Sequence, residues 1–276
     1  MIITSYYPGQ GFVEEEFSRE KHRPFPKILE NIVIKAGSNV LTKEGMLDKE
    51  AMMNIVQQIV QLKKKDISVT YVTSGSIAAG MACKGINKRP NDTNDRKAMS
   101  AIGQSELMHM YKQMFNIYGF NVGQILLEQT NLNEENGKTF KALKKYGAIP
   151  IINANDPVWD GEVNRDNDTL AAKTAQMLKA DLLIILTDEK GMYTANPKTD
   201  SHARLISYVG SVDEKILKAA TNETNANGTG GMLTKISLGK FIKSDWMIFD
   251  GIEKDSILNV LNGNNIGTYI RNCRTL

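Results

Sequence analysis

Short apolar runs alternate with helical patterns along most of this chain. The runs are bounded by glycine, asparagine, aspartate, serine or threonine, which is typical of buried strands that end in turns. Between the runs, apolar residues recur at three- and four-residue spacing, and this periodicity predicts helices with one face toward a core. The predicted strands are residues 31–35, 67–72, 120–127, 149–152, 181–186, 246–250 and 268–270, and the predicted helices are residues 49–65, 96–118, 134–146, 166–178 and 232–242.

This alternation predicts an α/β fold, a three-layer sandwich with a mostly parallel central sheet and helices on both faces. Residues 181–186 are nearly all apolar, as expected for a strand that is covered on both sides. Residues 1–30 follow no such pattern, so we predict an N-terminal extension, an arm or a partly ordered segment, before a single domain over residues 31–276. The helix at 96–118 is expected to be interrupted near Gly103, and its methionines and aromatic residues to serve the core or a subunit contact.

Composition and charge narrow the class of protein. The 276 residues carry a net charge of only +3, which gives no electrostatic argument for nucleic acid, and no apolar run is long enough to span a bilayer. The N-terminus lacks the basic and apolar segments of a secretion signal. Cys83 and Cys273 form neither a metal spacing nor a disulfide framework, and His22, His109 and His202 stand in unlike contexts. We therefore expect a cytoplasmic protein with reduced thiols and no histidine-based metal site.

Residues 149–170 combine an apolar run, a polar turn and the start of a helix. The turn delivers Asp156 to the carboxyl end of a predicted strand, and Asp166, Asn167 and Asp168 precede the helix. One such residue would serve as the N-cap, and three in a row exceed what capping needs. Because ligands of open α/β sheets bind beyond the carboxyl ends of the strands, this stretch is a candidate site, with capping as the open alternative.

Two lysines stand beside glycine-rich turns. Lys35 closes a predicted strand and is followed by Gly37, an arrangement that can hold a phosphate by charge and by backbone N–H groups. Lys235 lies in the first turns of a predicted helix after the stretch 222–235, whose consecutive N–H groups would form an anion nest. The alternatives are a solvated lysine beside an ordinary turn and a flexible loop. The chain contains no Walker A, G-x-G-x-x-G or G-x-S-x-G motif.

Four polar sites thus lie at the ends of predicted strands or loops, in residues 35–38, 73–75, 153–168 and 228–235. Two of them are cationic and rich in glycine, and two are neutral or acidic. This division suits a single cleft in which the cationic sites bind an anionic donor and the neutral or acidic sites bind an acceptor that carries an ammonium group.

Eight segments carry a resemblance to a known family, and they cover nearly all of residues 31–250 in the family's order. They are VIKAGSNVLT at 33–42, VTSGSIAAG at 72–80, MSAIGQSELM at 99–108, VGQILL at 122–127, PIINANDPV at 150–158, DNDTLAA at 166–172, LTDEKGMYTANP at 186–197 and GTGGMLTK at 228–235. On these segments the chain resembles the amino acid kinase family, and within it the members that phosphorylate L-glutamate.

The resemblance implies ATP- and Mg²⁺-dependent transfer of the γ-phosphoryl group to the side-chain carboxylate of L-glutamate. The product would be L-glutamyl 5-phosphate, an acyl phosphate on the way to proline. The N-terminal half of the domain would mainly bind the acceptor and the C-terminal half the nucleotide. The family also leads us to expect a homo-oligomer, a dimer or a tetramer, and proline as a feedback inhibitor that overlaps the glutamate pocket. Neither nucleic acid nor a membrane is an expected partner.

The resemblance also implies roles for residues that match the family's motifs. Lys35 and Lys235 would converge on the transferring phosphoryl group, with Asp168 between them to orient both. Mg²⁺ would be held through the ATP phosphates, with no ligand from the protein. The remaining roles are glutamate binding by Ser74, Asp156 and Asn167, phosphate binding by Gly37, Ser38 and Gly75, and nucleotide binding by Thr187, Asp188, Thr229, Gly230, Gly231, Met232, Leu233, Thr234 and Lys235.

Three features depart from the family pattern. Ala154 stands where glutamate is usual in the N-E-N-D turn, Ser38-Asn39 stands where Thr-Ser is common, and the chain ends without the C-terminal RNA-modification-type (PUA) domain of many members. Two alternatives therefore stay open. One is a related kinase with a different carboxylate or phosphate acceptor, and the other is a non-catalytic regulator that binds nucleotide or amino acid.

Overall fold

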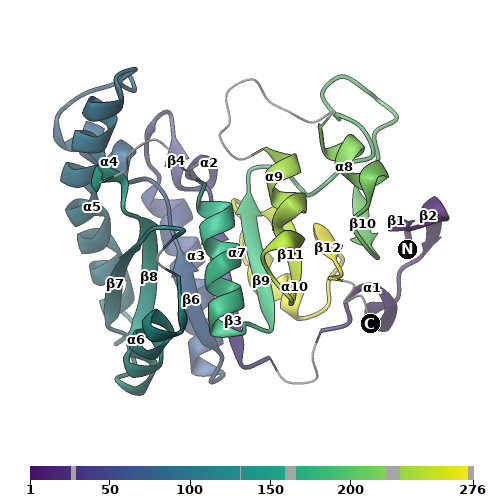
Figure 1. Ribbon diagram of the computed structural model, residues 1–276, viewed down its shortest axis with the longest axis horizontal. Coiled ribbons are helices and arrows are strands. Elements are labelled where there is room, and N and C mark those ends of the chain that lie inside the picture. Colours follow the sequence, from purple (N-terminus) through teal and green to yellow (C-terminus); the bar gives the residue numbers. More distant parts are fainter. Residues whose placement is uncertain (26–28, 131, 159–165, 222–230, 273–276) are drawn as a thin grey trace.

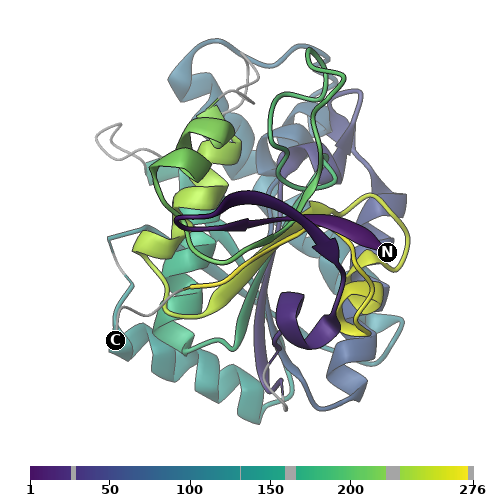
Figure 2. The ribbon, with the colours of Figure 1, turned by 90° about the vertical axis from the view of Figure 1, so that its right-hand side faces the viewer.

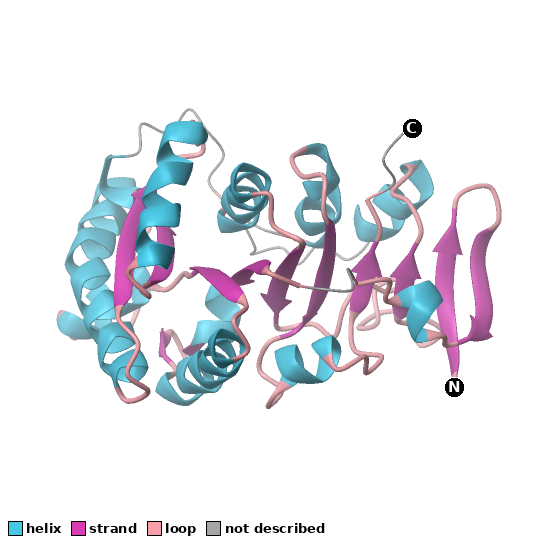
Figure 3. Cartoon of the chain, turned by 90° about the horizontal axis from the view of Figure 1, so that it is seen from below, coloured by secondary structure: helices cyan, strands magenta, loops and turns pink. Residues whose placement is uncertain are grey.

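The computed structural model describes residues 1–25, 29–130, 132–158, 166–221 and 231–272. Within them the backbone forms a ten-stranded sheet in the order β2-β1-β10-β12-β11-β9-β3-β6-β8-β7, with helices on both faces (Figure 1, Figure 3). Neighbours in this sheet run parallel except β1–β2 and β11–β12, so the predicted α/β fold with a mostly parallel sheet is confirmed. The strands are β1 (Ile2–Tyr7), β2 (Gly11–Glu16), β3 (Asn31–Ala36), β6 (Ser68–Val72), β7 (Val122–Leu127), β8 (Ile149–Ala154), β9 (Leu182–Thr187), β10 (Ile206–Val209), β11 (Asp245–Asp250) and β12 (Thr268–Ile270).

Two sets of helices cover the two faces of the sheet. Buried residues of α3, α5 and α10 belong to one core, and those of α6, α7, α8 and α9 to the other. None of the helices in the described ranges combines the length and apolar character that a membrane crossing needs. The helices are α1 (Arg19–His22), α2 (Ser38–Leu41), α3 (Lys49–Lys64), α4 (Ser76–Cys83), α5 (Thr93–Asn116), α6 (Glu134–Lys145), α7 (Asn167–Leu178), α8 (Glu214–Thr221), α9 (Met232–Ile236) and α10 (Ser256–Leu261), and a small hairpin pairs β4 (Thr42–Lys43) with β5 (Met46–Leu47).

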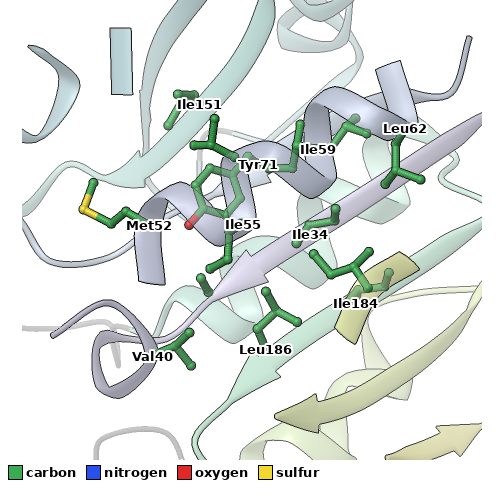
Figure 4. Packing of buried hydrophobic residues seen from close by; sticks show 14 of the residues in the cluster. Ile34, Val40, Met52, Ile55, Ile59, Leu62, Tyr71, Ile151, Ile184 and Leu186 are labelled. Carbon is green, nitrogen blue, oxygen red and sulfur yellow. The ribbon is translucent and has the colours of Figure 1, made fainter. Parts of the chain in front are cut away.

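The two cores follow from strand geometry, because successive side chains of a strand point to opposite faces of a sheet. In β9, Leu182, Ile184 and Leu186 lie in one core and Leu183 and Ile185 lie in the other. Figure 4 shows the first of these cores, where side chains of β3, β6 and β9 meet those of α3. A central strand that is apolar on both sides therefore holds the helices of both layers in place.

Helix α5 runs without a break from Thr93 to Asn116, so the predicted interruption near Gly103 is wrong. The glycine serves a close contact between helices instead. A Cβ atom at Gly103 would lie only 1.9 Å from the carbonyl oxygen of Ser76 in α4, and one at Gly80 would lie 1.9 Å from that of Met99. The two glycines let the backbones of α4 and α5 approach at this crossing.

The structure corrects the interpretation of residues 1–30 as an arm or partly ordered segment. Residues 2–16 form the β1–β2 hairpin at one end of the sheet, and β1 pairs in parallel with β10 (Figure 2). Arg23, which is 2% exposed, holds the chain after this hairpin against the sheet. Its guanidinium donates to the carbonyl oxygen of Ser207 in β10 at 2.7 Å and to that of Gly267, just before β12, at 3.3 Å. A search for apolar runs does not find β2, because the strand contains three consecutive glutamates, Glu14, Glu15 and Glu16, and alternates half-buried with exposed positions.

Candidate active site

The polar sites predicted from the sequence lie at one edge of the sheet. Strands β9, β3, β6 and β8 are parallel neighbours, so their carboxyl ends are side by side (Figure 1). Lys35 lies near the end of β3, Ser74 follows β6, Asn153 lies near the end of β8, and Thr187 ends β9. This edge is where ligands of open α/β sheets bind.

Asp168 joins the two lysines that the sequence places far apart. Its Oδ1 lies 2.5 Å from Nζ of Lys35, and its Oδ2 lies 3.1 Å from Nζ of Lys235. The three side chains are almost fully enclosed, with exposures of 6% for Lys35, 1% for Asp168 and 7% for Lys235. The expected convergence of the two lysines on one carboxylate is confirmed.

Asp168 forms an ion pair with each of the two lysines. Burial by itself would raise the pKa of Asp168, but the nearby charges of Lys35 and Lys235 outweigh it and hold that pKa below its usual value. Asp168 is therefore ionised at neutral pH, and the site brings two ammonium groups together where there is little access to water. Such a site attracts an anion strongly, because the local dielectric is low.

The hydrogen bonds at the start of α7 show which of Asp166, Asn167 and Asp168 caps the helix. Asp166 is the N-cap, and its Oδ1 accepts a hydrogen bond of 2.6 Å from the backbone N–H of Thr169. Because Asp166 caps the helix, the side chains of Asn167 and Asp168 are available for other contacts. They extend toward β3, β6 and β8.

Asn167 links the ends of two strands. Its Nδ2 donates to the carbonyl oxygen of Thr73 at 2.9 Å, to Oγ of Ser74 at 3.0 Å and to Oδ1 of Asn153 at 3.1 Å. Asn153 in turn donates through Nδ2 to Oε1 of Gln104 in α5 at 2.9 Å. This chain of amides fixes Asn167 and Ser74 next to each other.

Asp156 lies in a short 3-10 helix after β8 and contacts two serines that sequence reasoning missed. Ser100 in α5 donates to its Oδ2 at 2.8 Å, and Oγ of Ser76 in α4 lies 3.4 Å from the same oxygen. Ser100 stands inside a predicted helix, where a hydroxyl gives no periodic signal, and Ser76 is the first residue of α4, a helix that the sequence pattern did not predict. Only the crossing of α4 and α5 brings them to Asp156.

The glycine-containing turns after β3 and β6 differ in how they could contact a phosphate group. The backbone N–H of Gly37 donates to the carbonyl oxygen of Leu186 at 3.2 Å, which corrects the expectation that this N–H is directed at a phosphoryl group. The lack of a side chain at Gly37 leaves space for the Lys35 ammonium group, because a Cβ atom at position 37 would lie 3.3 Å from Nζ of Lys35. Ser38 is the exposed first residue of α2, and Gly75, with φ of +104°, precedes α4 in a conformation that favours glycine.

Two of the predicted nucleotide residues, Thr187 and Asp188, lie at the carboxyl end of β9. Asp188 accepts hydrogen bonds from Oγ1 of Thr187 at 3.2 Å and from Nδ2 of Asn39 at 3.0 Å. Helix α9 starts after Gly231 and contains Met232, Leu233, Thr234 and Lys235, whereas Thr229 and Gly230 lie outside the described residues. A cavity of about 390 Å³ between α8 and α9 is lined by Glu214, Leu217, Lys218, Thr221 and Leu233.

An enclosed Lys–Asp–Lys cluster at the carboxyl ends of parallel strands is typical of an α/β protein with a ligand site at that edge of the sheet. Residues 30–240 match the model of the amino acid kinase family. The chain is 36% identical over 264 residues to the glutamate 5-kinase of Clostridium tetani, which covers 92% of this chain and 98% of that protein. It is 40% identical over 250 residues to the glutamate 5-kinase of Dehalococcoides mccartyi, which covers 86% of this chain and 67% of the relative. The chain belongs to the amino acid kinase family.

Solved structures share the fold at low sequence identity. UMP kinase from Ureaplasma parvum superimposes with a TM-score of 0.62 at 16% identity, over 88% of this chain and 99% of that one. Isopentenyl phosphate kinase from T. acidophilum gives a TM-score of 0.57 at 17% identity, over 87% of this chain and 99% of that one. At these identities the likeness supports the amino acid kinase fold alone.

Proposed function

We propose that the protein transfers the γ-phosphoryl group of ATP to the side-chain carboxylate of L-glutamate, which is the activity of a glutamate 5-kinase. The product is L-glutamyl 5-phosphate, the first intermediate toward proline. The observation that carries this proposal is the Lys35–Asp168–Lys235 cluster with the Asp156 and Asn167 side chains at the same sheet edge. The names of relatives at 36% and 40% identity support it.

The two lysines supply charge to the transferring group. Phosphoryl transfer passes through a loose transition state whose charge spreads over three equatorial oxygens, so catalysis rests on positioning and electrostatic stabilisation. Lys35 and Lys235 approach Asp168 from different elements, β3 and α9, and would contact the phosphoryl group from two sides. Asp168 holds the ammonium groups in place and is no base, because the acceptor carboxylate is already ionised at pH 7.

The acceptor side of the site supplies groups for an amino acid. Asp156 would bind the ammonium group of glutamate, and Ser74 and Asn167 would hold the molecule so that its side-chain carboxylate faces the lysines. Asn167 suits this role because it is fixed to the ends of β6 and β8 by three hydrogen bonds. The N-terminal half of residues 31–276 would thus bind mainly the acceptor.

The nucleotide would occupy the C-terminal half, at Thr187, Asp188 and the turn before α9. Among the described residues, no three acidic, histidine or cysteine side chains gather in a way that could hold a metal ion. We expect Mg²⁺ to enter with ATP, because Mg²⁺ commonly keeps its waters and binds through substrate phosphates. When bound, the ion would neutralise phosphate charge beside the lysines.

Three further parts of the proposal concern the protein in the cell. We expect a cytoplasmic enzyme that forms a homo-oligomer, and we expect proline to inhibit it by competition at the glutamate pocket. The cytoplasmic location is an expectation from the sequence, and the oligomer and the inhibition by proline are expectations from the family resemblance. Inhibition by proline is tested by adding it to the assay described next.

The experiment measures ATP consumption with Mg²⁺ and a panel of acceptors, and a hydroxamate assay detects the acyl phosphate that a carboxylate acceptor would form. Glutamate should give the highest turnover in a panel with N-acetylglutamate, aspartate, UMP and carbamate, and N-acetylglutamate should be disfavoured because it lacks the free ammonium group that Asp156 would bind. The panel also addresses Ala154, which departs from the N-E-N-D turn that the resemblance implies. Faster ATP consumption with another acceptor would assign a different substrate, and ATP binding without any transfer would identify a regulator.

A further inference from the structure

Two serine hydroxyls meet at one oxygen of the Asp156 carboxylate. Ser100 donates to Oδ2 at 2.8 Å. Oγ of Ser76 lies 2.9 Å from Oγ of Ser100 and 3.4 Å from the same Oδ2. The three side chains come from three separate elements: α4, α5 and the 3-10 helix after β8.

The burial of the serines makes this arrangement energetically significant. Ser76 is 3% exposed and Ser100 is 1% exposed, so neither hydroxyl can satisfy its hydrogen bonds with bulk water. A hydrogen bond to an ionised acceptor is about twice as strong as a neutral one. The close crossing at Gly80 and Gly103 is what allows the two serines to reach each other.

A carboxylate held at one oxygen is restricted in its rotation, so its second oxygen points in a fixed direction. We propose that Ser76 and Ser100 are positioning residues that orient the Asp156 carboxylate toward the ammonium group of the acceptor. This inference rests on the proposed function, since it assigns Asp156 to the ammonium group of glutamate. The serines act through Asp156 and do not touch the reacting atoms.

The decisive variant is Ser100→Ala, which removes the shorter of the two bonds to Oδ2. The KM for glutamate should rise about tenfold, as expected for the loss of one charge-assisted hydrogen bond. The kcat at saturating glutamate should stay within about twofold and the KM for ATP should not change, because the lysine cluster is untouched. A role in folding alone would not raise the KM for one substrate only.

Control variants distinguish the effect of losing the Ser100 hydroxyl from the effect of a substitution elsewhere in α5. Ser105→Ala changes an exposed serine of α5 whose Oγ donates to the carbonyl oxygen of Ile102, and it should leave both KM values unchanged. Ser100→Thr keeps the hydroxyl and should restore most of the affinity for glutamate. Ser76→Ala should raise the KM for glutamate less than Ser100→Ala, and the double alanine variant should show non-additive effects because both serines serve one oxygen.

Three outcomes would overturn the inference. An unchanged KM for glutamate in Ser100→Ala would show that Asp156 needs no support, and equal increases for ATP and glutamate would reveal a general structural defect. If Ser100→Ala does not fold, an unchanged KM for glutamate in Ser76→Ala has the same meaning. Wild-type protein that forms no hydroxamate with glutamate would instead refute the proposed function.

Discussion

At the scale of single residues, the strongest feature is a carboxylate shared by two buried ammonium groups. Lys35→Ala and Lys235→Ala each remove a positive charge from the proposed site of phosphoryl transfer. Each variant should lower kcat by about 10²–10³-fold, the range measured when one group that stabilises a developing charge is removed. The control is Lys138→Ala, since this exposed lysine of α6 pairs with Glu135 at 2.5 Å and its loss should leave kcat unchanged. Near-normal turnover in either lysine variant would contradict the proposed mechanism.

Asp168 gives a prediction about pH and stability. The lysines hold its pKa in the folded protein below the value of about 3.9 for an unfolded chain, despite its burial. A lowered pKa contributes stability that is fully present above about pH 5 and is lost as the pH falls through the folded-state pKa. Asp168→Asn should therefore cost about 3–5 kcal/mol of unfolding free energy at pH 7, because two buried ammonium groups lose their partner. Urea titrations at pH 7 and pH 4 check this, and the difference between wild type and variant should be smaller at pH 4.

At the scale of elements, the crossing of α4 and α5 controls the acceptor side of the site. Gly103→Ala would place a Cβ atom 1.9 Å from the carbonyl oxygen of Ser76, and backbone atoms cannot move aside cheaply. The variant should lose about 1–3 kcal/mol of unfolding free energy, as overpacked cores do. Gly137→Ala in α6 is the matched control, since its nearest heavy atom outside the helix backbone is Cγ of Met177 at 3.8 Å. There the substitution should be neutral or stabilising by up to about 1 kcal/mol. Thermal denaturation of both variants measures the contrast.

The elements also show which structural features the sequence could predict. Strand β9 was predicted because it is apolar on both faces, and the cluster at the start of α7 was recognised because three polar residues exceed what one cap needs. Strand β2 alternates exposed and half-buried positions and carries Glu14, Glu15 and Glu16, so it lacks an apolar run. Ser76 and Ser100 were missed for a different reason. Their partner, Asp156, is distant in the sequence, and only tertiary packing brings the three together.

At the scale of the molecule, the candidate active site and the N-terminal hairpin lie at different places in the sheet. Lys35 lies on the inner strand β3 and pairs with Asp168 of α7, whereas β1 and β2 form one end of the sheet. Arg23 ties the chain after this hairpin to β10 and β12 through carbonyl oxygens. Burial lowers the pKa of its guanidinium to about 10, which means that the charged form is held in the folded protein at a cost in desolvation. Hydrogen bonds to carbonyl oxygens offset that cost.

This separation predicts that stability and activity respond differently to one substitution. Arg23→Lys keeps the charge but loses the planar fork that serves several acceptors, so it should lower the free energy of unfolding by about 1–3 kcal/mol. The kcat should stay within about twofold, because the active site belongs to β3, β6, β8 and β9. Hydrogen exchange should speed up first in β1 and β10. The control is Arg204→Ala, which breaks an exposed ion pair with Glu14 of β2 and should change stability by less than about 1 kcal/mol. A loss of turnover in Arg23→Lys that parallels the loss of stability would show that the hairpin and the active site form one cooperative unit.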